Sequence, residues 1–332
     1  MTKNKLGKIF ITGADGFIGS HLTERLVKEG YDVTALCIYN SIGTYGWLDR
    51  LADNQPKNLR LLLGDVRDAG FMERSIAGHD TVFHLASLIA IPYSYVAPQS
   101  YFDTNVNGAM NVANACLKAK VRRLIHTSTS EVYGTAQFVP ITELHPLQGQ
   151  SPYSASKISA DMLIESFCRS FQLPAVTLRP FNTYGPRQSL RAVIPTTIAQ
   201  VLQGAAEIRL GSITPTRDFN FVDDTVAAFI ALAEADDSVI GKIYNTGSGR
   251  EITIENMVKL LAKIAKRDVK IICEENRLRP ANSEVERLLC SSDKLISATG
   301  WKAMVSLEVG LERTMEWMRT DVNLKRATTY HK

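Results

Sequence analysis

"KIFITGADGFIGSH", residues 8–21, joins an apolar run to the start of an amphipathic stretch through three glycines. Glycines at such a turn let the backbone approach a pyrophosphate closely, and a helix that begins there offers free N–H groups. A glycine pattern alone is weak evidence, but this one follows the first predicted strand and opens the first predicted helix, which favours dinucleotide binding over a plain tight turn. We expect the turn to hold the cofactor through Gly13, Asp15, Gly16, Phe17, Ile18 and Gly19.

Short apolar runs and longer amphipathic runs alternate through the first half of the chain. The pattern predicts strands at 8–13, 32–37, 59–65, 80–86, 121–128 and 174–180. It predicts helices at 20–30, 103–119 and 153–171. Such alternation is typical of an α/β fold with a Rossmann-like, doubly wound parallel sheet, whose ligands bind beyond the carboxyl ends of the strands.

The pattern loosens from Pro180 onward, where prolines and glycines interrupt it and helices look shorter. One more buried strand, 242–248, is expected to return to the main sheet. We therefore predict a cofactor-binding domain over 1–180 and about 241–248, and a smaller, discontinuous substrate-binding lobe over 181–240 and 249–320. Residues 321–332 are expected to form a flexible tail.

The end of the second strand should carry an acid that bonds the adenosine ribose. Cys37 stands there instead, and no arginine follows at once to take a 2′-phosphate, so NAD is favoured and NADP is not excluded. The motif "GDVRD" after the third strand places Asp65 and Val66 where an adenine would lie, although Asp65 could instead cap a helix. Further cofactor contacts are expected from Tyr39, Asn40, Leu85, Ala86 and Ser87.

Groups that can move protons gather after the fifth strand, in "TSTSEVYG", residues 127–134, and in "YSASK", residues 153–157. Tyr153 and Lys157 are four residues apart and share one helix face. A lysine cation and a nearby nicotinamide cation would lower the tyrosine pKa toward neutrality, making Tyr153 a base for an alcohol under oxidation. His84 and His126 are expected to be satisfied strand histidines rather than catalysts.

The bulk composition is that of an ordinary globular protein, with 332 residues, 45% hydrophobic, 22% charged and a net charge of +4. No block of like charge suggests nucleic-acid binding, and no apolar stretch approaches a membrane span. The basic, then apolar start runs straight into the glycine turn without a cleavage site, so we do not interpret it as an export signal. Five scattered cysteines without a CxxC pair indicate a reduced, cytoplasmic protein with no metal site.

Seven motifs in this chain resemble the extended short-chain dehydrogenase/reductase family that acts on nucleotide sugars. They occur in the expected order between about residues 7 and 318: "TGADGFIGSHL", "GDVRD", "FHLAS", "TSTSEVYG", "YSASK", "RPFNTYGPR" and "TRDFNFVDD". Within the family, "LIAIPYSYVAP", "RAVIPT" and "RPANSEVERL" resemble the N-acetylglucosamine-nucleotide 4,6-dehydratases of legionaminic acid biosynthesis. The resemblance implies a tightly held NAD(P) and a homodimer formed through the helices at 103–119 and 153–171.

The resemblance also implies roles for individual residues. Tyr153 would take the sugar 4-hydroxyl proton while hydride leaves C4, Lys157 would support the phenolate, and Thr129 would bond the 4-oxygen. Glu131 would remove the C5 proton, after which water leaves C6 and hydride returns there. A positioned carboxylate suits that proton, which is only weakly acidic even beside a ketone. Asn105 would hold a helix distortion near the site.

Ser130 is a departure from the "TDE" that many 4,6-dehydratases carry, in which the aspartate protonates the leaving hydroxyl. Serine is too weak an acid to do this alone, so Glu131 would serve as both base and acid. GDP-mannose dehydratases share "TSE" and still lose water, and nucleotide-glucuronate decarboxylases share it without needing an acid at C6. Ser130 therefore brings the dehydratase and decarboxylase interpretations closer together.

The resemblance extends to the substrate, a nucleotide sugar. Guanidinium groups suit a diphosphate because they form bidentate contacts. The residues expected to bind substrate are Ile91, Tyr93, Asn182, Arg191, Arg217 and Arg279. The apolar stretch 89–95 suits an N-acetyl methyl group or a C6 methyl group better than a carboxylate, which favours a dehydratase of GDP- or UDP-N-acetylglucosamine. The alternatives are a uronate decarboxylase, a sugar 4-epimerase and, in a different class, a non-catalytic dinucleotide-binding regulator.

Overall fold

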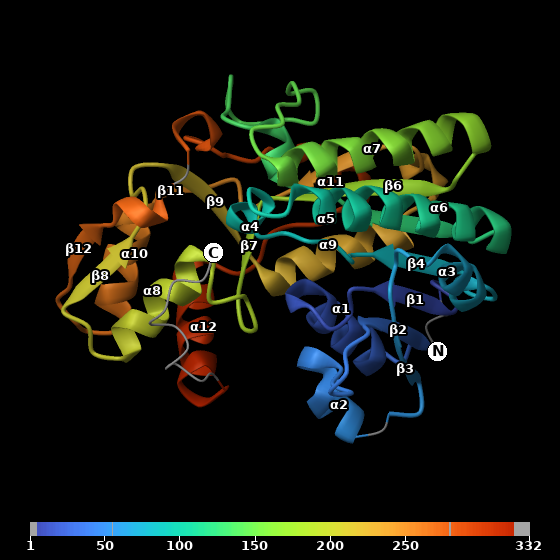
Figure 1. The fold of residues 1–332 in the computed structure, drawn as a ribbon, viewed down its shortest axis with the longest axis horizontal. Helices are drawn as coiled ribbons and strands as arrows, with labels where there is room; N and C mark the ends of the chain where they lie inside the picture. Colours follow the sequence, from blue (N-terminus) through green and yellow to red (C-terminus); the bar gives the residue numbers. More distant parts are fainter. Residues whose placement is uncertain (1–4, 55, 279, 322–332) are drawn as a thin grey trace.

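A seven-stranded, all-parallel sheet forms the centre of the protein in this computed structural model, which describes residues 5–54, 56–278 and 280–321 (Figure 1). Along the sheet the strands run β10-β6-β5-β4-β1-β2-β3. Their bounds are β1 Ile9–Thr12, β2 Val33–Ile38, β3 Leu59–Gly64, β4 Thr81–His84, β5 Arg123–Thr127, β6 Ala175–Pro180 and β10 Ile243–Thr246. The order reverses at β1 and β4, and a ligand crevice lies at such a switch point in folds of this kind.

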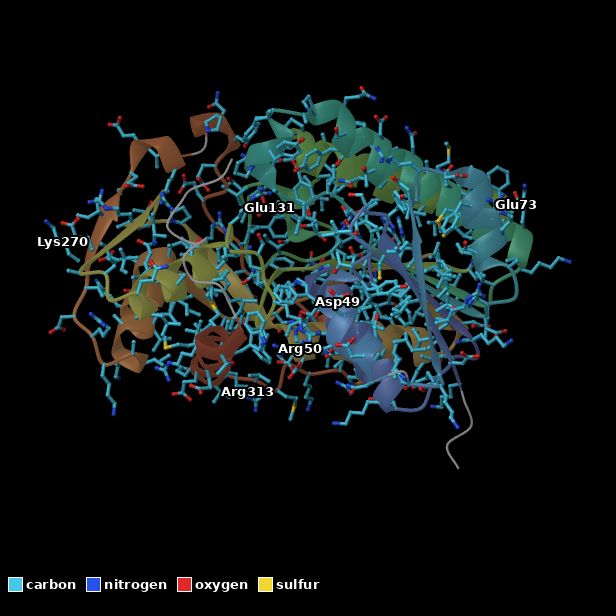
Figure 2. All side chains as sticks on the ribbon, turned by 60° about the horizontal axis from the view of Figure 1, so that its bottom comes forward. Asp49, Arg50, Glu73, Glu131, Lys270 and Arg313 are labelled. Atoms are coloured by element: carbon cyan, nitrogen blue, oxygen red, sulfur yellow. The ribbon has the colours of Figure 1, made fainter. Side chains whose placement is uncertain are left out.

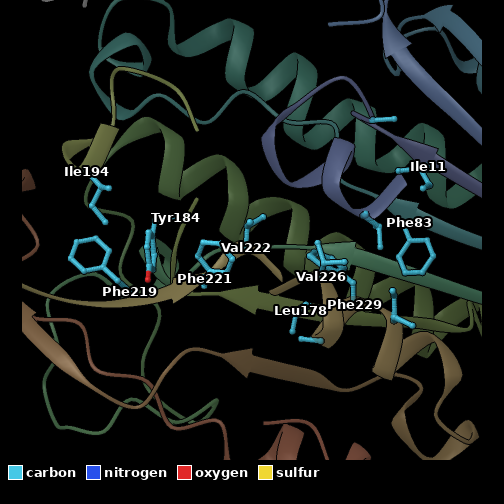
Figure 3. Packing of buried hydrophobic residues seen from close by; sticks show 14 of the residues in the cluster. Ile11, Phe83, Leu178, Tyr184, Ile194, Phe219, Phe221, Val222, Val226 and Phe229 are labelled. Carbon is cyan, nitrogen blue, oxygen red and sulfur yellow. The ribbon is translucent and has the colours of Figure 1, made fainter. Parts of the chain in front are cut away.

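Alternate side chains of each strand enter two different cores, as the pleat requires. Ile9 and Ile11 of β1 pack on one face of the sheet, and Phe10 packs on the other. Because both faces are covered, the central strands are buried on both sides, and their polar residues, such as His84, His126 and Arg179, are buried with them. Figure 3 shows the first core, in which Phe83 of β4 meets Phe229 at 6.4 Å between ring centroids.

The helices divide between these two faces. One face carries α3 Ala69–Ile76, α6 Gly108–Ala119 and α7 Pro152–Phe171, and α6 and α7 run side by side in Figure 1. The other carries α1 Phe17–Lys28 and α9 Val222–Glu234. Shorter helices are α2 Asp49–Asp53, α4 Ile91–Ser94, α5 Pro98–Tyr101 and α11 Asp293–Thr299, with 3₁₀ turns η1 Gly46–Leu48, η3 Ser130–Tyr133, η4 Asp237–Val239, η5 Glu275–Arg277 and η6 Ala281–Ser283.

Two local features position the functional segments. A capping box between Ser151 and Ser154 starts α7 and so places Tyr153 in its first turn. Before α6, the chain forms a π-helix, η2 Phe102–Asn107. Asn105 lies inside it, buried, with its amide bonded to the Leu88 backbone and to the Ser156 hydroxyl. The expected helix distortion at Asn105 is therefore present.

The second half of the chain contains more regular structure than its sequence suggests. β10 does return to the main sheet beside β6, as predicted. The expectation of a single further strand is wrong, because β7 Asn182–Tyr184, β9 Thr216–Phe221 and β11 Glu251–Thr253 form one small sheet, and β8 Glu207–Leu210 and β12 Lys270–Cys273 form another. These strands are short and pair across long sequence separations, which local patterns do not reveal.

The helices α8 Val193–Leu202, α10 Ile254–Ile264 and α12 Leu307–Asp321 complete this C-terminal lobe. The predicted domain boundaries remain a prediction, and the expected tail lies outside the described residues beyond 321. Within the described part of the chain, none of the helices combines the length and apolar character that crossing a membrane requires.

Candidate active site

The glycine turn between β1 and α1 is shaped for a close approach. Gly13 has a φ of +67°, and a Cβ there would lie 2.7 Å from the Ala86 backbone nitrogen. A Cβ on Gly19 would collide with the Gly13 carbonyl oxygen. Helix α1 begins at Phe17, and its N-cap residue, Gly16, has no side chain to cap the first N–H groups. The turn therefore fits a pyrophosphate, as predicted for a dinucleotide site.

The ends of β1 and β4 are joined beside this turn. The Thr12 hydroxyl oxygen accepts hydrogen bonds from the Leu85 and Ala86 backbone N–H groups, both at 3.1 Å, and lies 2.8 Å from His84 Nδ1. Ser87 donates to Asn105 Oδ1 at 2.9 Å. The segment 85–87 is thus held next to the glycine turn, where the sequence places cofactor contacts.

The end of β2 has no acid of its own. Cys37 is fully buried, and burial raises the pKa of its thiol to about 12. Ile38 and Tyr39 are exposed beyond it. Asn40 organises the following loop, with its amide bonded to the carbonyl and the N–H of Thr44 at 2.8 and 3.1 Å. Cys37 therefore takes no part in binding a ribose.

Beyond β3, Asp65 pairs with Arg67, whose Nη2 lies 2.6 Å from Asp65 Oδ2. The alternative interpretation of Asp65 as a helix cap is wrong, because Asp68 caps α3 by accepting from the Phe71 N–H at 2.8 Å. The Arg67 contact lowers the pKa of Asp65. Val66 is buried beside it.

The predicted catalytic residues converge at the carboxyl end of β5. Tyr153, in the first turn of α7, hydrogen-bonds the Thr129 side chain and is 7% exposed. The Glu131 backbone N–H donates to Thr129 Oγ1 at 3.2 Å, and Ser130 between them is buried. In Figure 2, Glu131 lies near the middle of the molecule, toward the C-terminal lobe.

The pKa of Tyr153 differs from the sequence-based expectation that it is lowered toward neutrality. Burial raises the pKa of Tyr153, and the nearby Glu131 adds to the rise although the Thr129 hydrogen bond opposes it. The chain alone therefore does not provide the expected lowering, since Lys157 donates instead to the Thr127 carbonyl at 2.6 Å. Burial lowers the pKa of Lys157 to about 8, and the charge of Asp161 counteracts that effect.

A group of buried polar side chains lies directly behind Lys157, and sequence reasoning missed it. We call Lys157, Asp161, Arg179, His126 and Ser128 the buried charge cluster. Asp161 Oδ2 accepts from the Ser128 hydroxyl at 2.7 Å and from Arg179 Nη2 at 2.9 Å. Burial alone would raise the pKa of Asp161, but hydrogen bonding and the Arg179 charge outweigh it and lower the pKa. The YxxxKxxxD spacing of Tyr153, Lys157 and Asp161 was the available signal.

The two histidines differ in how well they are satisfied. His84 bonds Thr12, and its ring stacks on His126 at 5.7 Å between centroids. His126 Nε2 lies 3.3 Å from Asp161 Oδ1, but neither ring nitrogen makes a well-aligned hydrogen bond within the described residues. Burial lowers the pKa of both rings, which favours the neutral form. The expectation of a satisfied histidine is confirmed for His84 and wrong for His126.

Aromatic and apolar side chains line the approach to Tyr153. Ile91 packs with Tyr101 and Tyr153 in one small cluster. Tyr93 is 38% exposed, and its ring lies 6.3 Å from that of Tyr101. Burial raises the pKa of Tyr101 to about 12, Tyr93 adds to this, and the charge of Arg191 opposes it. Ile91, Tyr93 and the exposed Arg191 are thus brought toward Tyr153.

The remaining substrate candidates lie toward the C-terminal lobe. Asn182 Oδ1 is buried without a hydrogen-bond partner in the part of the chain that the structure describes. Arg217, on β9, is buried and donates to Glu284 at 3.3 Å. The hydroxyl of the neighbouring Ser283 lies 2.5 Å from the Tyr95 hydroxyl, so the segment that contains Ser283 and Glu284 contacts the segment that contains Tyr93 and Tyr95. Arg279 lies outside the described residues.

Comparisons with known proteins agree with this geometry. The family described as GDP-mannose 4,6 dehydratase matches residues 10–314. The low-salt glycan biosynthesis protein Agl12 of Haloferax volcanii is 31% identical, over 94% of this chain and 99% of its own length.

Two solved structures also superpose closely. The dTDP-glucose 4,6-dehydratase DesIV of Streptomyces venezuelae, a double mutant with NAD bound, has a TM-score of 0.85 at 28% identity and covers 95% of this chain and 97% of its own. A UDP-N-acetylglucosamine 4-epimerase from Methanobrevibacter ruminantium, in complex with UDP-N-acetylmuramic acid, has a TM-score of 0.85 at 30% identity and covers 95% and 99%.

Proposed function

The chain belongs to the GDP-mannose 4,6 dehydratase family, and from that premise we propose that it is an NAD-dependent 4,6-dehydratase of a nucleotide-linked N-acetylhexosamine. The substrate is GDP- or UDP-N-acetylglucosamine, and the product is its 4-keto-6-deoxy derivative, made for a bacterial surface sugar. The observation that carries the proposal is the convergence of Thr129, Glu131, Tyr153 and Lys157 at the carboxyl end of β5.

The residues around the glycine turn fit the cofactor. The backbone of 13–19 and the uncapped start of α1 suit the pyrophosphate, and the segment 85–87 lies beside them. When bound, NAD would supply a hydride acceptor at the sugar C4 and a hydride donor at C6. The catalytic side chains must then handle four proton movements: one from the 4-oxygen, one from C5, one to the departing 6-oxygen and one back to C5.

Tyr153 is the base for the 4-hydroxyl, and its hydrogen bond with Thr129 places a second hydroxyl beside the same oxygen. Lys157 lies one helical turn behind and supplies positive charge that favours the phenolate. Glu131, on the 3₁₀ turn η3, removes the C5 proton and returns a proton to the leaving hydroxyl. Ser130, between Thr129 and Glu131 in the chain, is buried and serves as a hydrogen-bonding group rather than an acid.

The apolar wall supports the choice of sugar. Ile91 packs against Tyr101 and Tyr153, so this surface presents apolar and aromatic groups. Such a surface favours an acetyl methyl group, whereas a uronate carboxylate would lose hydration beside these side chains. A 4-epimerase is the second candidate, supported by the similarity to the UDP-N-acetylglucosamine 4-epimerase and by Ser130 in place of an acid.

We also propose a homodimer through α6 and α7. These helices lie side by side, and Met110, Met162 and Phe171 are 38%, 42% and 58% exposed along them. Two such pairs would form a four-helix bundle. Replacing Met110 and Met162 together with glutamate should convert the protein to a monomer in light scattering, and an unchanged mass would contradict this interface.

The test is incubation with GDP- or UDP-N-acetylglucosamine and NAD in D₂O, followed by mass spectrometry. Loss of one water with deuterium gained at C5 supports dehydration with Glu131 as the base. An unchanged sugar formula with inverted C4 would establish the epimerase instead, and loss of carbon dioxide from a uronate would establish the decarboxylase.

Replacing Tyr153 by phenylalanine is expected to lower turnover at least about 100-fold, because it removes the proton acceptor. Cofactor binding should stay nearly intact. Tyr31→Phe is the matched control, since its hydroxyl bonds Glu234 and belongs to no part of the site. An unaffected rate in Tyr153→Phe would end the catalytic assignment.

A further inference from the structure

The end of β2 lacks an acid, but an acidic side chain from another segment lies beside it. Thr12 pairs with Leu36 in the sheet, and the Ala14 N–H then donates to the Leu36 carbonyl at 3.0 Å. The glycine turn therefore continues alongside the last residues of β2 instead of leaving the sheet at once. Asp15, the next residue, is brought to the position beside Ile38.

The loop after β2 holds Asp15 at that position. The Trp47 N–H donates to the Asp15 carbonyl at 3.3 Å, and a Cβ on Gly46 would lie 3.1 Å from Asp15 Cβ, so the loop after β2 closes over it. The Ile38 backbone lies close enough to the Asp15 carboxyl group to oppose the rise of its pKa. Burial raises the pKa of Asp15, while the Ile38 backbone and its own backbone favour the anion.

A second carboxylate lies nearby but is already engaged. Asp49 accepts from the Tyr45 N–H at 2.7 Å and from the Thr44 hydroxyl at 2.5 Å. Both Asp15 and Asp49 act electrostatically on the Cys37 thiol, which places the two of them at the same end of β2. Arg50 follows Asp49 on α2 and is exposed. Both residues are labelled beside this helix in Figure 2.

We propose that Asp15 is the specificity-determining carboxylate of the cofactor site, accepting the adenosine ribose 2′-hydroxyl of NAD and repelling the 2′-phosphate of NADP. Folds of this kind place an acid at the end of β2 for that purpose. Here the carboxylate with that role belongs to Asp15, in the glycine turn after the neighbouring strand β1. Cys37, at the end of β2, packs in the core instead. The inference deepens the proposed function, on which the use of NAD rests.

The test measures binding and needs no turnover. Purified protein, freed of bound dinucleotide with charcoal, is titrated with NAD and with NADP in a calorimeter. The wild type should bind NAD at least about 10-fold more tightly than NADP. Asp15→Asn should reduce that preference by roughly 10- to 100-fold, because a hydrogen bond to a charged group is lost for NAD and a like-charge repulsion is relieved for NADP.

Two control variants identify the group responsible. Asp49→Asn should change the preference much less, since its carboxylate is held by Thr44 and Tyr45. Arg50→Gln should leave it unchanged. Asp15→Ser repeats the test if Asp15→Asn melts early. The assignment would be overturned if the wild type bound NADP as tightly as NAD, or if an Asp15 variant kept the wild-type preference. If instead the Arg50 variant changed the preference, the specificity-determining role would belong to Arg50. If the wild type and the Asp15 variants bind the two dinucleotides as expected but the protein does not dehydrate the sugar, the role of Asp15 is supported and only the proposed reaction is refuted.

Discussion

Two regions of this protein pair the same kinds of charged groups in opposite surroundings. In the buried charge cluster, Arg179 and Asp161 lie 2.9 Å apart with side chains 1% and 0% exposed. On the C-terminal lobe, Lys259 and Glu255 lie 2.6 Å apart with side chains 62% and 44% exposed. They border a hollow of about 720 Å³ between α10 and β12 that also includes Lys263 and Arg267.

The difference shows that distance alone does not decide what an ion pair contributes. The shorter pair is solvated, and solvated pairs contribute little because water and salt screen them. In the cluster, each charge depends on its partner, since a lone charge there would be unsolvated. Burial also moves the pKa values of Lys157, Asp161 and His126 away from their ordinary ranges. Proton chemistry is therefore expected beside the cluster and not at the hollow.

The strongest test of this comparison is Asp161→Asn. The substitution keeps the shape of the side chain but leaves Arg179 without its counter-charge, so it should lower the free energy of unfolding by about 3–5 kcal/mol. Urea unfolding measures this. Ser128→Ala removes one hydrogen bond to Asp161 without changing charge, and its cost should be smaller, about 1–3 kcal/mol. A loss below about 1 kcal/mol for Asp161→Asn would mean that water reaches the cluster.

A second test uses the pH dependence of stability. The pKa of Lys157 is about 8 in the folded protein and 10.5 as the ordinary value, so the unfolded chain binds more protons between these pH values. The burial cost of the ammonium is therefore present in full below pH 8 and is relieved as pH rises toward 10.5, by up to about 3 kcal/mol. Wild-type stability relative to Lys157→Met should rise across that window.

Unfolding curves of both proteins at several pH values check this expectation. Lys259→Met, on the exposed pair, controls for the loss of one lysine. If the difference between wild type and Lys157→Met stays flat or falls as pH rises, the lysine is not buried as an ammonium and the contrast between the two regions fails.

The smallest effect is expected at the hollow itself. Glu255→Gln removes the partner of Lys259 on the surface of α10 and should change the free energy of unfolding by less than about 0.5 kcal/mol. The same urea series measures it, and salt should reduce even this effect. A cost above about 2 kcal/mol would show that the exposed pair is as tightly coupled as the buried one.

The sequence predicts the features that depend on local patterns. The glycine turn, the alternating strands and the spacing of Tyr153 and Lys157 are each contained within a few neighbouring residues, so their placement follows from periodicity and steric rules. Pairings across long separations are different. Asp161 meets Arg179 only because α7 packs behind β6, and Asp15 reaches Ile38 only because β1 and β2 share a register.

The C-terminal lobe illustrates the same limit. Its strands hold three to six residues each, and prolines and glycines interrupt the runs between them. Edge pairs such as β8 with β12 gain their stability from α8, which packs on β8 and is itself covered by α10, rather than from their own residues. Tyr153 is a subtler case, because the sequence identifies the phenol but not the burial that raises its pKa.

The edge-to-face contact of two indole rings joins the loop after β2 to α12. Trp47 belongs to the loop that closes over Asp15, and Trp317 belongs to α12, with 5.5 Å between their centroids. The chain has three tryptophans in all, so two of its three indoles report on one junction. Their emission should therefore change when a dinucleotide settles against the neighbouring loop, and a reduced nicotinamide would quench it by energy transfer. The two indoles would then serve as an optical reporter of cofactor occupancy, at the point where α12 contacts the loop after β2.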